Sequence, residues 1–259
     1  MKWPQLLRHN LNLTQKIVVA GLLMVMAMIF QKVFAVNYIA VIPFLRISLG
    51  GPAVIILSSI WLGPLYGLVV GLGSDVLGYL ILDPKNNAFF PQITAIYALL
   101  GLSAYFVFFI IKRIKSRKMF FIEIIAMLAV YTFVTIFLFV NKEIKLYSST
   151  YVLELWQKFL ITGILLLLFL IIILFIYFFN RRHKDKFDTS FDVYQISFAC
   201  FFLELFVMVN FGTVMKGMAF GFMTYPMILI CQIIVMFINI PLNTVLLSYL
   251  TTIIETNRF

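Results

Sequence analysis

The sequence predicts an all-α, polytopic membrane protein, and three features of its composition indicate this fold class. Apolar residues make up 63% of the 259 residues, charged residues only 12%, and the mean hydropathy is +1.07. A soluble domain averages about 45–50% apolar and about 25% charged residues. The 29 phenylalanines also exclude a disordered chain, which is poor in aromatic residues. We therefore expect one integral membrane domain over residues 1–259.

Uncharged runs predict eight helical segments along the chain. A membrane span needs about 20 apolar residues, and most of the segments reach that length. The segments are 16–35, 52–62, 65–82, 93–112, 119–141, 158–180, 192–213 and 225–252. The second is too short to cross alone, at a rise of about 1.5 Å per residue. Gly63 and Pro64 interrupt the helix after it, so we expect a tight helical hairpin there, covered by protein.

The distribution of basic residues predicts that both termini face the cytoplasm. An even number of spans puts the termini on one side, and lysine and arginine are enriched in cytoplasmic loops. This N-in, C-in orientation places 13 of the 20 basic residues on the inner side, many of them in KRIKSRK at 112–118. The outer segments are then 36–51, 83–92, 142–157 and 214–224. Tyrosine and tryptophan in 143–158 predict a short helix at the membrane surface.

Motifs of soluble enzyme chemistry are absent from the sequence. There is no phosphate-binding GxxxxGK[ST] loop, no HExxH and no GxSxG. Cys200 and Cys231 lie in apolar runs without CxxC spacing, so we expect free thiols, no bound metal and no cofactor. Only Asp75 and Glu204 lie well inside predicted spans, which argues against an enzyme and weakens the case for a proton relay.

The third predicted helix has a face of small residues beside a carboxylate. Gly67, Gly71, Ser74 and Gly78 follow helical spacing, which indicates either tight internal packing or a surface that slides against a partner. Asp75 adjoins this face. A charge at that depth needs a partner or a cavity, so Asp75 either bonds to the exposed backbone amides near the Gly63–Pro64 break or contacts a ligand.

Candidate binding residues cluster in the predicted outer segments. Arg46 lies in FLRISLGG, where a loop can present it to a carboxylate or a planar polar ring; the alternative is contact with lipid headgroups. Asn210 lies at a similar predicted depth, where it bonds to a ligand or to a neighbouring helix. Asn87, Phe90 and Gln92 belong to NNAFFPQ, whose aromatic residues suit either a membrane interface or stacking on a flat ligand.

Several of these fragments, taken in order, resemble a known family. FLRISLGG, IWLGPLYGLVVGLGSDVLGYL and NAFFPQITAIYALLG are similar, in order and spacing, to the folate-family substrate-binding (S) component of energy-coupling factor vitamin transporters. The similarity covers about residues 16–112. A weaker match, VNFG and IPLNTVLLSYL, lies within 192–252, and the segment 113–191 reads as an inserted helical pair.

The resemblance implies a six-helix core that captures a vitamin, folate-like, on the outer face of a bacterial plasma membrane. The partners would be a scaffold membrane subunit and two ATPase subunits, with no role for nucleic acid. Arg46, Asn210, Phe90, Gln92, Asn87 and Asp75 would bind the substrate, and Ala20, Gly21 and Ala27 would contact the scaffold. Other vitamins, a stand-alone secondary transporter and a lipid-modifying membrane enzyme stay open as alternatives.

Overall fold

The computed structural model is a helical bundle, and seven helices among its described residues are long and apolar enough to cross a membrane. It describes residues 6–7, 11–35, 50–82, 89–141, 143–146, 149–152, 154–183, 190–220 and 225–256. The predicted fold class is confirmed: this is a helical, multi-pass membrane protein. An eighth apolar helix, of 12 residues, is too short to span a bilayer by itself and is the first half of the helical hairpin.

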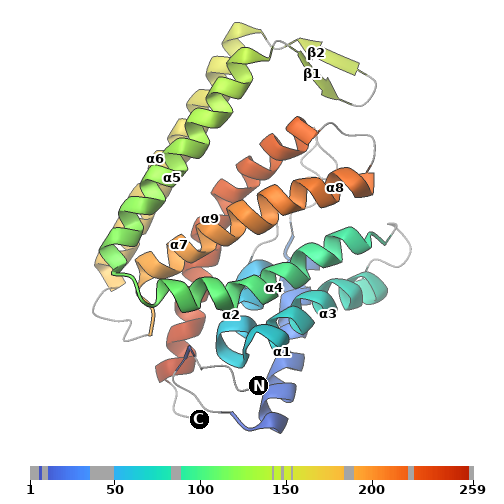
Figure 1. The fold of residues 1–259 in the computed structure, drawn as a ribbon, viewed down its shortest axis with the longest axis vertical. Coiled ribbons are helices and arrows are strands. Elements are labelled where there is room, and N and C mark those ends of the chain that lie inside the picture. The colour runs from blue at the N-terminus through green and yellow to red at the C-terminus, as the bar shows by residue number, and fades with distance from the viewer. Residues whose placement is uncertain are drawn as a thin grey trace.

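The helices follow the predicted order with small shifts at their ends. The first four are α1 (Leu13–Lys32), α2 (Gly51–Leu62), α3 (Pro64–Leu82) and α4 (Pro91–Ile111). The others are α5 (Ser116–Val140), α6 (Leu155–His183), α7 (Val193–Leu203), the π-helical segment η1 (Glu204–Phe211), α8 (Gly212–Phe220) and α9 (Tyr225–Thr256). The termini of α1 and α9 that carry Leu13 and Thr256 lie at the same end of the molecule (Figure 1).

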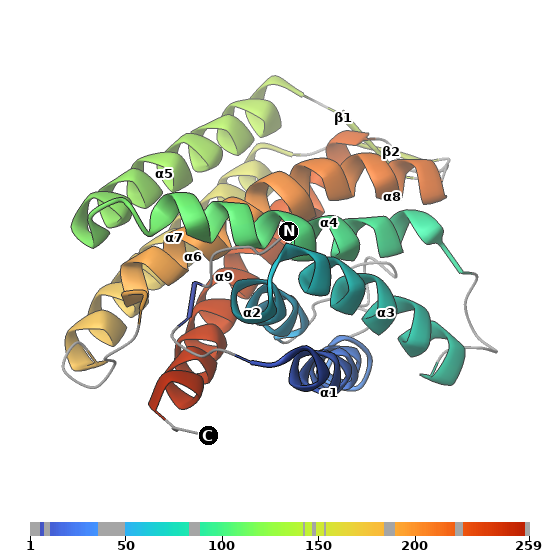
Figure 2. The ribbon, with the colours of Figure 1, turned by 60° about the horizontal axis from the view of Figure 1, so that its bottom comes forward.

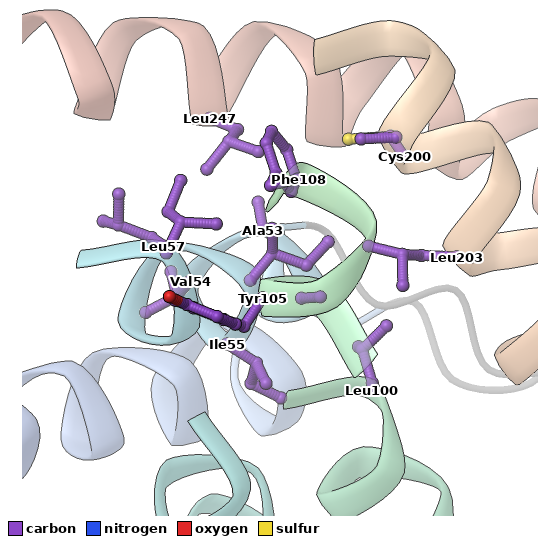
Figure 3. Packing of buried hydrophobic residues seen from close by; sticks show 14 of the residues in the cluster. Ala53, Val54, Ile55, Leu57, Leu100, Tyr105, Phe108, Cys200, Leu203 and Leu247 are labelled. Atoms are coloured by element: carbon purple, nitrogen blue, oxygen red, sulfur yellow. The ribbon is translucent and has the colours of Figure 1, made fainter. Parts of the chain in front are cut away.

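The predicted break at Gly63 and Pro64 is present. Gly63 has a φ of 112°, a conformation that strongly favours glycine, and Pro64 begins the next helix, where its fixed φ is favourable. Nearly every residue of the short α2 is buried, so other helices cover its ends. Figure 3 shows Val54, Ile55 and Leu57 of α2 packed among side chains from α4, α7 and α9.

Two apolar clusters divide the interior. The first surrounds α2 and draws on α1, α3, α4, α7 and α9. The second joins α5 and α6 to α7 and α9. Figure 2 shows α1 and α3 on one side of the molecule and α5 and α6 on the other, with α7 and α9 between. The α5–α6 pair therefore packs on the outside of α7 and α9.

One expectation about the segment after α5 is wrong. Two antiparallel strands form here instead of a surface helix, with β1 (Glu143–Leu146) paired to β2 (Ser149–Val152). Isoleucine, tyrosine, valine and threonine are frequent here and favour extended backbone. The strand pair lies at the end of the molecule opposite to Leu13 and Thr256 (Figure 1).

The seventh predicted helix also differs from the expectation, because it does not end near residue 213. It continues through η1 and α8 to Phe220, since one lysine, Lys216, does not terminate a helix that is otherwise apolar. The π-helical turns of η1 were not predicted. Such turns are rare and occur often at functional sites.

Candidate substrate-binding site

A buried polar group forms where α1, α3 and α4 meet. The hydroxyl of Thr94 donates to Asp75 Oδ2 at 2.6 Å, and Lys32 Nζ lies 3.8 Å from Asp75 Oδ1. Gln31 Nε2 donates to Ser74 Oγ at 3.4 Å. Both Asp75 and Thr94 are buried, so each bond is formed away from water, where it is stronger. We call Gln31, Lys32, Ser74, Asp75 and Thr94 the Asp75 group.

The partners of Asp75 in the structure are side chains of α1 and α4, whereas the sequence suggested a ligand or the amides near the Gly63–Pro64 break. The Asp75 carboxylate bonds to residues of two neighbouring helices, which offsets the cost of burying a charge. The small residues of α3 are packed internally: a Cβ on Gly71 would collide with the backbone of Tyr97, and one on Gly78 would meet Lys32. In this structure they form a close helix contact and not a free surface.

Two of the predicted ligand-binding residues, Phe90 and Gln92, lie at the start of α4, next to the Asp75 group. Gln92 precedes Thr94 by two positions, and its Oε1 is buried without a hydrogen-bond partner among the described residues. Phe90 caps the start of α4. The ring of Phe89 lies 5.1 Å from the ring of Tyr79, one turn beyond Asp75 on α3. Asp75, Phe90 and Gln92 thus occupy one end of the α3–α4 pair.

Of the other predicted substrate-binding residues, the structure describes Asn210, which lies apart from this group. Arg46 and Asn87 lie outside the described residues. Asn210 is exposed on η1, and its side-chain amide donates to the Leu205 carbonyl oxygen at 2.8 Å. No hydrogen bond within the described part of the chain connects Asn210 to Asp75 or Gln92.

The three residues predicted to contact a scaffold subunit have different surroundings. Gly21 lies on the exposed side of α1, and a Cβ there would meet nothing within 4 Å. Ala20 and Ala27 are buried against the rest of the bundle, with 6% and 0% exposure. Only Gly21 is therefore available to a partner in this conformation.

Two more carboxyl groups are buried between the helices, and the sequence placed only one of them, Glu204, well inside a span. Glu204 is buried in η1, and Asn243 Nδ2 of α9 donates to its Oε1 at 3.0 Å. On α5, Glu123 accepts a hydrogen bond of 2.7 Å from Ser197 Oγ of α7. A polar helix face could have been recognised from the sequence, because the spacing of Ser197, Cys200 and Glu204 places them on one side of a helix. Glu123 was missed because it lies near a helix end, where a charge usually reaches water.

Comparison of the chain with known proteins does not assign it to a family. No protein-family model, no curated protein and no solved structure matches the chain. The class that the structure defines is a helical, multi-pass membrane protein with buried polar groups between its helices.

Proposed function

We propose that this protein is the substrate-binding subunit of an energy-coupled importer that captures a folate-like vitamin. The observation that carries the proposal is the position of the Asp75 group. It lies beside Phe90 and Gln92 at one end of α3 and α4, the segments that contain the motifs resembling the S-component family. The basic-residue distribution predicts that this end faces outward.

The proposed roles follow from the chemistry of each side chain. Arg46 binds a carboxylate or a polar ring edge in bidentate geometry. Gln92 offers its unpartnered Oε1 to a ring N–H, and Phe90 and Asn87 close over the ligand. Asp75 holds Lys32 and Thr94 in place at the bottom of the site. The side-chain N–H of Asn210 donates to the Leu205 carbonyl oxygen, so the side-chain oxygen of Asn210 is the atom proposed to contact the ligand.

Energy would come from partners, in keeping with the absence of a phosphate-binding loop in the sequence. The proposed partners are a scaffold membrane subunit and two ATPase subunits in a bacterial plasma membrane. On α1, Val18, Leu22 and Val25 are exposed beside Gly21. This apolar face contacts lipid in the free protein and is proposed to contact the scaffold in the complex. The protein's role is binding and not catalysis.

The test is identification and titration of the ligand. The full chain is purified in detergent, any bound small molecule is identified by mass spectrometry, and that compound is titrated back. Replacing Arg46 by alanine removes a hydrogen bond to a charged group, which contributes about 1.5–3 kcal/mol, or about 10- to 150-fold in affinity. Arg117→Ala, at the exposed start of α5, is the matched control. Unchanged affinity in Arg46→Ala contradicts the assignment of the site.

A stand-alone secondary transporter is the second candidate, and the buried carboxylates of Glu123 and Glu204 favour it. Buried acidic groups in transmembrane helices often belong to ion pathways. Transport by the protein alone in vesicles, lost in Glu204→Gln, would select this candidate. Transport only in the presence of a scaffold and ATPases would select the importer.

A further inference from the structure

Glu204 of η1 and two asparagines of α9, Asn239 and Asn243, bring together more oxygen acceptor atoms than nitrogen donor atoms. Asn243 Nδ2 donates to Glu204 Oε1, and Asn239 forms a side-chain hydrogen bond with the same carboxyl group. Glu204, Asn239 and Asn243 are only 3%, 2% and 1% exposed. Within the described residues, the Oδ1 atoms of both asparagines are buried without a hydrogen-bond partner. A buried acceptor without a partner is costly, so two of them beside a carboxylate need an explanation.

The backbone around these side chains departs from a regular α-helix at two places, although α9 is continuous from Tyr225 to Thr256. Pro241 lies within α9 between the two asparagines, and it lacks the N–H that would bond to the carbonyl oxygen of Phe237. On the facing element, Glu204 begins the π-helical segment η1. The carbonyl oxygen of Phe237 therefore lacks its usual helical donor in the same region.

The charges around Glu204 leave its carboxylate without a direct counter-ion. No ion pair within 4 Å joins Glu204 to a basic side chain in the described part of the chain. Lys216 of α8 interacts with it only at longer range. Cys200 of α7 and Glu123 of α5 are also buried in this part of the interior, and neither carries a positive charge. A cation at this position would neutralise the carboxylate.

We propose that Glu204, Asn239 and Asn243 bind a monovalent alkali cation between η1 and α9. Oxygen ligands select a hard cation, and a single carboxylate matches a single positive charge. The cation would satisfy the two amide oxygens that otherwise lack partners. This site lies between different elements from the Asp75 group, so the proposal does not rest on the proposed vitamin-binding function.

The experiment measures thermal unfolding of the full chain in detergent, in NaCl or KCl against choline chloride at equal ionic strength. Binding to the folded state alone raises Tm by about 3 °C or more when the cation is at about ten times its dissociation constant. Equilibrium binding of radioactive Na⁺ should saturate near one ion per chain. Glu204→Gln and Asn239→Ala should abolish both signals.

Glu123→Gln is the matched control, because it neutralises another buried carboxylate outside the site and should retain the cation response. A single monodisperse peak in gel filtration verifies that each variant is folded. Two site variants are used so that the test still stands if one of them does not fold. The proposal is overturned by equal unfolding temperatures in all three salts. It is also overturned if Glu204→Gln and Asn239→Ala respond to the cation like the wild type.

Discussion

At the residue scale, the structure shows how this membrane protein buries charges. Asp75 meets Lys32 at 3.8 Å and accepts from Thr94 at 2.6 Å, and both charged side chains are about one-tenth exposed. Glu123 and Glu204 instead bond to neutral side chains, Ser197 and Asn243. The charges near one end of the α1–α3 pair are therefore paired, whereas those between α5, α7, η1 and α9 are held by polar neutral groups.

A residue-scale prediction concerns the Asp75–Lys32 pair. Asp75→Asn leaves a buried lysine facing a neutral amide, so we expect a loss of about 1.5–3 kcal/mol in the free energy of unfolding. Adding Lys32→Met should recover part of that loss, because a buried pair replaced as a whole costs less than a broken one. A double-mutant cycle on thermal unfolding measures the coupling. A coupling energy of zero would show that the pair contributes nothing.

At the element scale, the contact between α3 and α4 depends on glycine. A Cβ on Gly101 of α4 would collide with the backbone of Gly67 on α3, and one on Gly67 would also meet Ser59 of α2. Small residues allow helix backbones to approach closely in lipid, where packing replaces the hydrophobic effect as the driving force. This close approach brings Thr94 of α4 within hydrogen-bonding distance of Asp75 on α3.

The element-scale prediction compares two glycines in helices. Gly101→Ala must move α3 away from α4, and we expect it to destabilise the protein by about 1–3 kcal/mol. Gly21→Ala places its methyl group in open space on α1, so we expect unchanged or slightly higher stability. Thermal unfolding of both variants in the same detergent gives the comparison. Equal unfolding temperatures would contradict the close contact between α3 and α4.

At the scale of the whole molecule, α7 and α9 connect two packed units. One unit is centred on α2, and the other adds α5 and α6 (Figure 2). Many apolar side chains on α5 and α6 are exposed, including Ile125, Phe133, Leu167 and Phe178. In a bilayer these side chains face lipid, as expected of helices with mean hydropathy far above that of a soluble protein.

The prediction at this scale is the orientation in the membrane. Lys115, between α4 and α5, and Glu154, before α6, are exposed and lie at opposite ends of α5 and α6. In intact cells, a membrane-impermeant maleimide should label Glu154→Cys and should label Lys115→Cys only after permeabilisation. The natural thiols of Cys200 and Cys231 are buried and serve as the unlabelled background. The reverse labelling pattern would overturn the N-in, C-in orientation.

Much of the fold could be predicted from the sequence, because lipid imposes simple length and polarity rules. The segment predicted at 65–82 is Pro64–Leu82 in the structure, and the break at Gly63 is where it was expected. The strand pair at 143–146 and 149–152 was missed because local aromatic content suits a surface helix and a strand equally. The π-helical turns of η1 were missed because the side chains there are those of an ordinary apolar helix.

The candidate site was less accessible to prediction for a different reason. Asp75 and Gln92 were identified from type and depth, but their surroundings depend on residues distant in sequence: Lys32 lies 43 positions before Asp75, and Thr94 lies 19 after it. The acceptor-rich group around Glu204 depends equally on Asn243, 39 positions away.

By itself the sequence determined that the chain spans a membrane and where its helices run, because an apolar segment in lipid must satisfy its own backbone hydrogen bonds. Only the tertiary structure decided which polar side chains meet inside the bundle. Those meetings depend on the rotation and close approach of whole helices, which no local pattern specifies.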